Sequence, residues 1–189
     1  MGEDASLKND EEIVKLVQSG KIEFFSLLVD RYENKIKRYG KNFISNKEDI
    51  NDIIQEVFIK AYKNIQSFDV NRKFSSWLYR IAHNEMVNAL RKKKFLPLMF
   101  FDLDILFPHS CYNNIDNHID QKDMKKMIDG CLDKLEPKYR EPVALHYLEG
   151  LSYKEISDIM QIPISTVGVR IKRAKNTMKS ILKKIGYNL

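Results

Sequence analysis

Residues 151–178 read LSYKEISDIMQIPISTVGVRIKRAKNTM, and this stretch predicts two helices separated by a short break. Ser152 followed three positions later by Glu155 is a capping box, which marks the start of a short helix. Pro163 cannot continue that helix because its nitrogen has no hydrogen to donate. A longer helix with several basic residues follows the proline. We therefore expect a helix-turn-helix in this part of the chain.

The longer of these two helices has one apolar face and one polar face. Apolar residues recur at steps of three or four: Ile164, Val167, Ile171, Ala174, Met178, Ile181 and Ile185. The opposite side holds Ser165, Val169, Lys172, Arg173 and Asn176, with Thr166 and Arg170 at its edges. Such side chains contact base edges and phosphates, so the pattern predicts a helix that enters the major groove of DNA. The residues alone leave one alternative, a helical hairpin whose basic face is exposed to solvent.

Helical periodicity also dominates the rest of the chain, which predicts an all-α protein. No glycine occurs between Gly40 and Gly130, and the alternation typical of strands is missing. The expected helices are one capped by Asp10, one over residues 22–43, one opened by a capping box at Ser45 and Glu48, and others over residues 75–94, 123–135 and 137–148. Pro142 predicts a late start or a kink in the last of these.

The charge distribution divides the chain into three parts. Residues 20–94 carry sixteen Lys and Arg against nine Asp and Glu, and residues 122–189 carry fourteen against eight. Residues 95–121 have four Asp and no basic residue. We therefore predict two small helical domains, 1–94 and 122–189, joined by a linker over 95–121. Basic blocks inside helical patterns favour a polyanionic partner such as nucleic acid.

Other classes of protein are not supported by the sequence. The two cysteines stand twenty positions apart, and the four histidines show no HExxH spacing, so we expect no disulfide framework, no metal and no cofactor. No glycine-rich phosphate loop or activated nucleophile is recognisable, and we expect no enzymatic activity. The first twenty residues are polar and acidic, unlike a signal peptide, and no apolar run approaches the ~20 residues of a membrane span. A cytoplasmic location is the resulting expectation.

Four stretches together resemble a known family. They are DIIQEVFIKAYKNIQSF (52–68), FSSWLYRIAHNEMVNALR (74–91), LEPKYREPVALHYLEGLSYKEISDIM (135–160) and STVGVRIKRAK (165–175). In this order they resemble the extracytoplasmic-function (ECF) class of bacterial sigma factors, in the sigma-70 family, over about residues 20–94 and 122–185. The resemblance implies a subunit without catalytic activity that binds core RNA polymerase and directs promoter-specific transcription initiation.

The same resemblance implies a function for each predicted domain. Residues 1–94 would form sigma region 2, which binds the polymerase clamp and recognises and melts the −10 element. Residues 122–189 would form sigma region 4, whose helix-turn-helix reads the −35 element. The linker would run through the polymerase cleft. An anti-sigma factor is a further implied partner, and the apolar run LPLMFFDLDILF (96–107) is our hypothesis for part of its contact.

The resemblance also assigns residues to the three binding surfaces. Those for −10 DNA are Phe68, Asn71, Arg72, Lys73, Arg80, Asn84, Asn88 and Arg91. Those for −35 DNA are Ser165, Thr166, Val169, Arg170, Lys172 and Arg173. Those for the polymerase are Asp52, Gln55 and Glu56. Spacing alone would make the last three an ordinary exposed face, with pairs such as Glu56–Lys60.

Two departures from the family pattern bear on DNA recognition. Gly168 and Val169 stand where the family more often has charged or polar residues, so the −35 contacts depend more on the remaining side chains and on phosphates. The loop FDVNRK (68–73) lacks the glycine often found there. A different function also fits part of the chain, namely a stand-alone helix-turn-helix regulator. It predicts tight binding to duplex DNA without polymerase, but it leaves the match over residues 52–91 unexplained.

Overall fold

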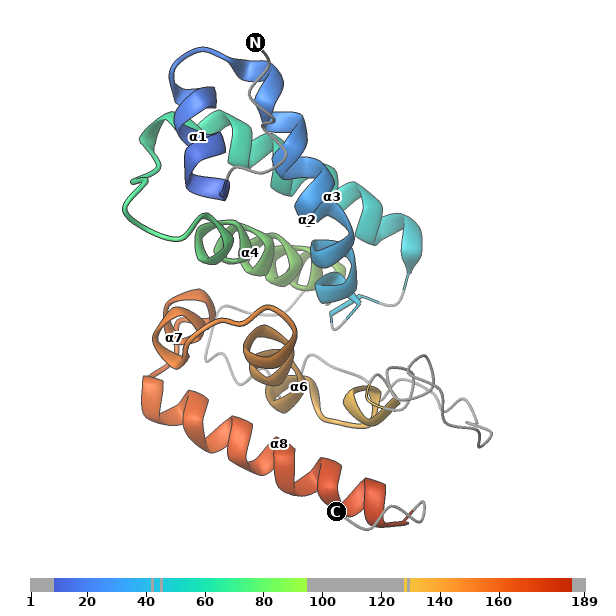
Figure 1. Ribbon diagram of the computed structural model, residues 1–189. Coiled ribbons are helices and arrows are strands. Elements are labelled where there is room, and N and C mark those ends of the chain that lie inside the picture. The colour runs from blue at the N-terminus through green and yellow to red at the C-terminus, as the bar shows by residue number, and fades with distance from the viewer. Residues whose placement is uncertain (1–8, 42, 45, 95–127, 129, 185–189) are drawn as a thin grey trace, which may run out of the picture. The chain divides into compact units, whose positions relative to one another are not determined.

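The computed structural model of the protein describes residues 9–41, 43–44, 46–94, 128 and 130–184. Within these ranges every regular element is a helix (Figure 1). The helices form two compact units, with α1 to α4 in the first and α6, most of α7 and α8 in the second. The predicted all-α fold with two helical domains is thus confirmed. The predicted linker and the boundary before residue 122 fall outside the described residues, so the domain limits stay a prediction.

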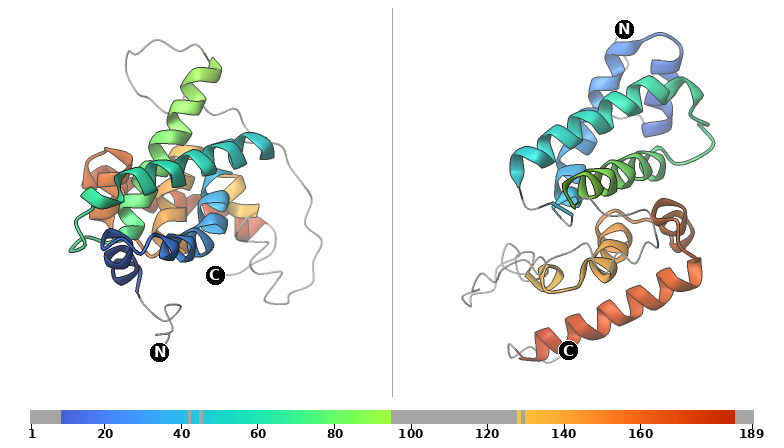
Figure 2. Two further views of the ribbon diagram at one scale, coloured as in Figure 1. Left: turned by 90° about the horizontal axis from the view of Figure 1, so that it is seen from above. Right: turned by 180° about the vertical axis from the view of Figure 1, so that it is seen from behind.

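The N-terminal unit is an α-helical bundle. Its elements are α1 (Asp10–Gln18), the short 3-10 helix η2 (Ile22–Phe24), α2 (Phe25–Gly40), α3 (Lys47–Asn64), the 3-10 helix η3 (Ile65–Ser67) and α4 (Phe74–Lys94). α3 packs along α4, and α2 contacts both of them (Figure 2). An ion pair of 2.7 Å between Lys60 Nζ and Glu85 Oε1 links α3 to α4 at the surface.

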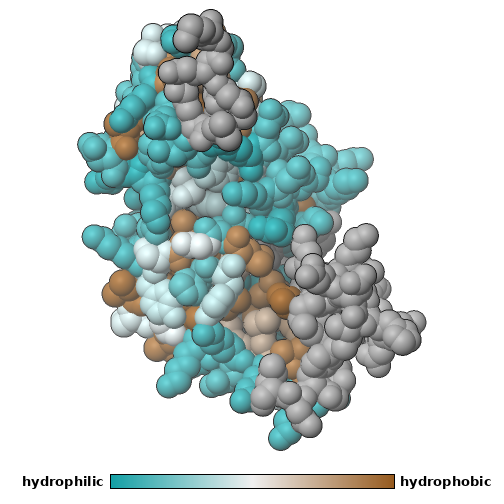
Figure 3. Space-filling model, viewed as in Figure 1, coloured by the Kyte–Doolittle hydropathy of each residue, from teal (hydrophilic) through white to brown (hydrophobic). Residues whose placement is uncertain are grey.

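The core of this unit follows the helical periodicity of its sequence. The inner face of α2 is buried through Leu28, Tyr32, Ile36 and Tyr39. From α4 the buried side chains are Phe74, Leu78, Tyr79, Ala82, His83, Met86, Val87 and Leu90. The side chains on the face of this unit seen in Figure 3 are mostly hydrophilic. Apolar burial of this extent is the main force that holds such a bundle together.

Two helix starts differ from the prediction by one residue. Asn9, rather than Asp10, caps α1, and it forms a capping box with Glu12 through bonds of 2.8 and 2.9 Å. Asn46, rather than Ser45, caps α3, because its Oδ1 accepts from the backbone N–H of Glu48. Asn and Ser are both good N-cap residues, so adjacent candidates cannot be separated by propensity alone. Asp10 is thereby freed for a tertiary contact.

The C-terminal unit contains α6 (Pro137–Val143), the π-helix η5 (Ala144–Leu148), α7 (Tyr153–Met160) and α8 (Ile164–Lys184). Only residues 128 and 130–135 of the helix predicted over 123–135 belong to the described ranges. The predicted kink at Pro142 takes the form of a change from α-helix to π-helix directly after Val143. Proline has no backbone N–H, so the carbonyl four residues earlier in the helix loses its hydrogen-bond donor. The wider turn of the π-helix accommodates this interruption of the helical hydrogen bonds.

The predicted helix-turn-helix is present. Ser152 and Glu155 form the expected capping box at the start of α7. Gln161 closes that helix in the left-handed conformation, with φ of 54°. Ser157 Oγ donates to the carbonyl of Ile162 at 2.6 Å. This bond ties α7 to the turn, and α8 begins directly after Pro163.

The apolar stripe of α8 is shorter than predicted. Val167, Ile171 and Ala174 are buried, whereas Ile164 is 52% exposed. Ile164 is the first residue of α8, so no earlier turn of the helix covers its side chain. Ile185 lies outside the described residues. Every helix within the described ranges is too short or too polar to span a bilayer.

Candidate nucleic-acid interface

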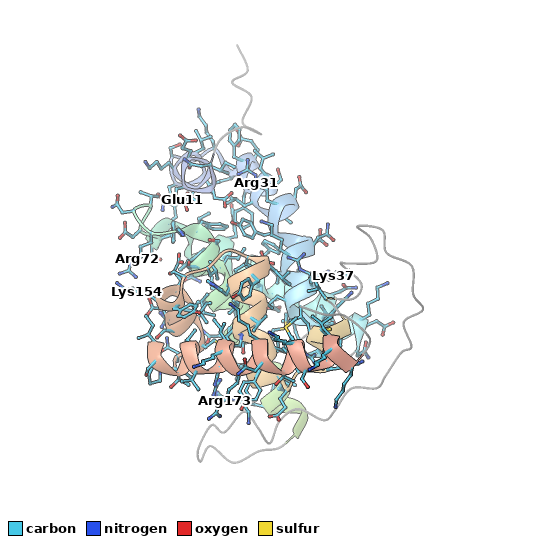
Figure 4. The ribbon with its side chains drawn as sticks, turned by 60° about the horizontal axis from the view of Figure 1, so that its bottom comes forward. Glu11, Arg31, Lys37, Arg72, Lys154 and Arg173 are labelled. Atoms are coloured by element: carbon cyan, nitrogen blue, oxygen red, sulfur yellow. The ribbon has the colours of Figure 1, made fainter. Side chains whose placement is uncertain are left out.

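A six-residue loop, Phe68–Lys73, connects η3 to α4 in the N-terminal unit. Asp69 organises it, because its Oδ1 accepts from the backbone N–H of Asn71 at 3.0 Å and from Asn71 Nδ2 at 2.9 Å. The backbone N–H of Arg72 donates to the carbonyl of Asp69 at 2.9 Å. Asn71, Arg72 and Lys73 are exposed, and the Arg72 side chain, 81% exposed, extends outward (Figure 4).

Phe68 does not belong to the exposed part of this loop. Its side chain is 6% exposed, and its ring centre lies 5.0 Å from that of Trp77 and 5.9 Å from that of Phe74. The sequence assigned Phe68 to the DNA surface, but this packing makes it part of the support beneath the loop. The resemblance located the loop, whereas the direction of one aromatic ring depends on tertiary packing.

Four residues of α4 that the resemblance assigns to −10 DNA form a polar stripe along one side of the helix. Arg80, Asn84 and Asn88 follow one another at steps of four and are all exposed. Arg91 continues the stripe but is half-buried. His83, on the inner side of the helix, has its Nδ1 3.2 Å from the hydroxyl oxygen of Tyr39. The guanidinium and amide groups of the stripe follow directly after the loop, so both present hydrogen-bonding groups to solvent in the same unit.

The exposed face of α3 combines polar and apolar side chains. Asp52, Gln55 and Glu56 are exposed as predicted. Lys60 pairs with Glu85 of α4, so the alternative of a Glu56–Lys60 pair is not realised. Sequence reasoning missed Ile59, 44% exposed, which continues the same face. The sequence could have indicated it, because Ile59 is apolar but does not fall on the helical period of the buried residues of α3.

The outer face of α8 carries the residues predicted for DNA. Ser165, Val169, Lys172 and Arg173 are exposed, and Arg173 extends away from the helix (Figure 4). Thr166 and Arg170 are half-buried, in keeping with their predicted place at the edges. The opposite side of the helix is buried through Val167, Ile171 and Ala174. α8 therefore has a fixed orientation about its own axis, with hydroxyl and basic groups outward.

An aromatic group next to α8 was missed by sequence reasoning. His146 stacks edge-on against Tyr147 and Tyr153, with ring centres 4.7 and 5.0 Å apart. Lys175 Nζ lies 5.0 Å from the centre of the Tyr147 ring, and hydrogen bonding to Tyr147 raises the pKa of that lysine. No sequence pattern relates residues 147 and 175. They meet because η5 continues α6, which packs against α8. In the described part of the chain, no three His, Cys, Asp or Glu side chains gather where they would hold a metal ion.

Comparison with known proteins identifies both units. The family model of sigma-70 region 2 matches residues 28–95, and that of sigma-70 region 4 matches residues 125–178. The ECF RNA polymerase sigma factor SigW of Bacillus subtilis is 36% identical over 179 residues, which cover 90% of this chain and 95% of that protein. The ECF RNA polymerase sigma-E factor of Haemophilus influenzae is 34% identical over 181 residues, 90% of this chain and 94% of that protein.

Two solved structures have the same fold. The structure of CnrH in complex with the cytosolic domain of CnrY gives a TM-score of 0.63 at 23% identity, over 96% of this chain and 99% of that one. The sigma factor RpoE of Bartonella quintana, solved with the anti-sigma factor NepR, gives a TM-score of 0.62 at 24% identity, over 84% of this chain and 96% of that one. The sequence identities to the curated relatives, together with the two matched regions, are sufficient to assign the family. The chain belongs to the ECF RNA polymerase sigma factors of the sigma-70 family.

Proposed function

We propose that this sigma factor divides promoter recognition between its two units. The N-terminal unit binds core RNA polymerase through α3 and reads the −10 element through α4 and the loop 68–73. The C-terminal unit reads the −35 element through α8. The observation that carries the proposal is the stripe of Arg80, Asn84 and Asn88, exposed on one face of α4, the helix that follows a loop whose last three residues are exposed and polar.

The N-terminal surface suits DNA whose strands have separated. Asn and Arg side chains hydrogen-bond to base edges, and an unpaired base offers all of its edges. The loop supplies Asn71, Arg72 and Lys73 as exposed polar and cationic groups beside that stripe. Contacts with a flipped base form only after melting, so their free energy favours the open form of the promoter. The chain thus drives promoter opening by binding, with no enzymatic activity of its own.

On α3 the proposed polymerase surface includes Asp52, Gln55 and Glu56, with Ile59 one turn further along. The mixture supports a protein partner, since exposed carboxylates select a basic surface and an apolar side chain adds buried area. Lys60 is held by Glu85, which leaves the carboxylate of Glu56 available to a partner. Single substitutions in this set should weaken the complex with core polymerase and leave the structure of the unit intact.

On α8 the proposed −35 contacts come from Ser165, Thr166, Val169, Arg170, Lys172 and Arg173. Ser165 is exposed near the N-terminal end of the helix, where recognition helices contact base edges. Lys172 and Arg173 lie further along and suit phosphates. Gly168 adds no side chain to this surface, and Val169 offers only an apolar contact, such as one with a thymine methyl group.

An anti-sigma factor is the proposed regulatory partner. One of the two solved structures with this fold is a sigma factor bound to an anti-sigma factor, which motivates the proposal. The predicted contact in the apolar run 96–107 lies outside the described residues. Replacing Phe100, Phe101 and Leu103 with serine tests it: unchanged affinity for the inhibitor would rule out that contact.

One reconstitution tests the proposal as a whole. The purified chain is mixed with core RNA polymerase, and transcript starts are mapped on genomic DNA. Specific starts are expected, and Asn84→Ala should abolish most of them while polymerase binding persists. Asn34→Ala, an exposed asparagine on α2, is the matched control and should initiate like wild type. Failure to form a complex with core would overturn the proposal. Specific duplex binding without core would point instead to a stand-alone helix-turn-helix regulator.

A further inference from the structure

Both ends of the loop 68–73 are hydrogen-bonded to α1. At the first end, Gln18 Nε2 donates to the carbonyl of Ile65 at 2.7 Å and to the carbonyl of Phe68 at 2.9 Å. These carbonyls belong to η3 and to the first loop residue, so one amide group determines how the chain leaves η3. Gln18 stands 47 and 50 positions earlier in the sequence, and the contact is partly buried.

At the second end, Glu11 Oε1 accepts from the backbone N–H of Phe74 at 2.8 Å. Phe74 is the first residue of α4, and the first N–H groups of a helix have no partner within the helix. A carboxylate is also favourable there because it lies at the positive end of the helix dipole. Glu11 thus acts as an N-terminal cap for α4, contributed by a different helix 63 positions away.

α1 is itself anchored firmly to the bundle. Ile13, Val14 and Val17 are buried. Asp10 accepts from Arg31 Nη1 at 2.7 Å and from the hydroxyl of Tyr32, both on α2. A helix held by apolar burial on one side and by charged hydrogen bonds at its start is a rigid support. The loop is therefore attached at both ends to a part of the unit that does not itself carry the proposed DNA-binding residues.

We propose that α1 is a positioning element for the loop, and that Gln18 and Glu11 hold the loop in the shape that grips an unpaired nucleotide. α1 then sets the affinity of the sigma factor for single-stranded −10 DNA without touching the DNA. The physical reason is preorganisation, since a loop already held in its binding shape loses less conformational entropy when it binds. The inference rests on the proposed role of the loop, and it extends that role to residues preceding the stretch matched to sigma-70 region 2, residues 28–95.

The test uses the full chain bound to core RNA polymerase. The probe is a fluorescently labelled single-stranded oligonucleotide with the −10 sequence found by transcript mapping. Gln18→Met keeps the length of the side chain and removes both donors, so affinity for this probe should fall about tenfold or more, because the two hydrogen bonds that hold the first end of the loop are lost. Affinity for core polymerase and for a duplex −35 fragment should remain at the wild-type value.

A pair of variants at Glu11 separates positioning from general stability. Glu11→Gln retains an oxygen acceptor for the Phe74 N–H and should bind the probe like wild type. Glu11→Leu has no acceptor and should lose affinity as Gln18→Met does. Trp77, the only tryptophan of the chain, packs on Phe68 beside the loop, so its fluorescence in the free chain reports a change in loop packing. Gln18→Met should shift this emission before any DNA is added.

Two loop variants distinguish failure of this inference from failure of the proposed function. If Arg72→Ala and Lys73→Ala leave the affinity for the single strand unchanged, the loop does not bind DNA and the proposed function is wrong there. If they weaken binding but Gln18→Met and Glu11→Leu do not, the positioning role of α1 is wrong. Equal losses for Glu11→Gln and Glu11→Leu, or equal losses for single-stranded and duplex probes, would also overturn it.

Discussion

Tyr153 Cε2 lies 3.7 Å from the point that a Cβ atom on Gly168 would occupy, an ordinary van der Waals distance. Gly168 is inside α8 and its φ is not positive, so the backbone does not require glycine there. The family departure at this position therefore removes a side chain from α8, the helix proposed to read the −35 element, without a structural reason in the described residues. Glycine has a low helix propensity, so its presence lowers the stability of α8.

Gly168→Ala should raise the free energy of unfolding of the C-terminal unit by about 0.5–1 kcal/mol, because alanine loses less backbone entropy in a helix. Urea denaturation of the full chain followed by circular dichroism measures it. Gly150 is the matched control in the same unit, since its φ is +68°. Gly150→Ala should lower stability by about 1 kcal/mol through left-handed strain. Equal losses of stability in the two variants would contradict the difference in backbone conformation between Gly168 and Gly150.

Gly40 should behave in the opposite way to Gly168. A Cβ atom at this position would stand 2.7 Å from Met86 Cε and 3.2 Å from Ile50 Cγ2, and Met86 is fully buried. Gly40→Ala should cost about 1–3 kcal/mol of stability through overpacking. Adding Met86→Val removes the crowding methyl group, so the double variant should lose less than the sum of the single ones. A Gly40→Ala chain as stable as wild type would mean that Met86 moves aside without cost.

Arg140 holds the start of the C-terminal unit together. Its Nε donates to the carbonyl of Leu132 at 2.8 Å, and its Nη2 donates to those of Asp133 and Leu135 at 2.6 and 3.0 Å. Burial lowers the pKa of the Arg140 guanidinium from its ordinary value, opposed by the charge of Asp133. The three hydrogen bonds to backbone carbonyls therefore compensate for the removal of the Arg140 charge from water.

Arg140→Lys should cost about 2–4 kcal/mol of stability, because a lysine ammonium is a compact donor that cannot serve three spread carbonyls. Thermal unfolding of the full chain measures the loss. Arg173→Lys, on the exposed face of α8, is the matched control. The bond from Arg173 Nη1 to the Tyr139 hydroxyl is 3.4 Å long and exposed, so this variant should stay within about 0.5 kcal/mol of wild type. If the two variants prove equally stable, the three bonds to Arg140 contribute nothing.

Ionisation of Tyr32 should lower the stability of the protein in alkali. Burial, and then its hydrogen bond to Asp10, raise the pKa of Tyr32 well above its ordinary value. A group whose pKa is raised on folding stabilises fully below its unfolded value, here about 10, and loses that contribution as the pH rises above it. Urea unfolding from pH 8 to 12 should thus give a smaller decline for Tyr32→Phe than for wild type. Identical slopes above pH 10 would show that Tyr32 is not linked to folding.

Lys172 and Ser165 should affect −35 binding in different ways. Lys172→Ala removes one proposed phosphate contact, so affinity should fall similarly for all sequences. The slope of the logarithm of the binding constant against the logarithm of the salt concentration should become less negative by about 0.9. Ser165→Ala should instead change the preference for one base. Titration of the holoenzyme with duplex −35 fragments at several salt concentrations measures both. A base-specific effect of Lys172→Ala would reverse these roles.

Much of the fold was predictable from the sequence because its signals are local. The capping box at Ser152 and the break at Pro163 lie within one turn of the structures that they specify, and both predictions are confirmed. Adjacent cap candidates were the weak point, as Asn9 and Asn46 replaced their neighbours. Arg80 and Asn84, which the resemblance assigned to a binding surface, are exposed. The burial of Phe68 was not predicted, because no local pattern specifies which way a loop aromatic turns.

The sequence by itself determined an all-α chain, the helix-turn-helix and the family, because periodicity, caps and motif order are properties of neighbouring residues. Only the tertiary structure decided how the loop 68–73 is held. Gln18 and Glu11 reach its two ends across roughly fifty and sixty positions of chain, and no spacing rule connects them. Hydrogen bonds between distant segments depend on how helices pack. For that reason the support of the proposed DNA-binding loop could be found only in three dimensions.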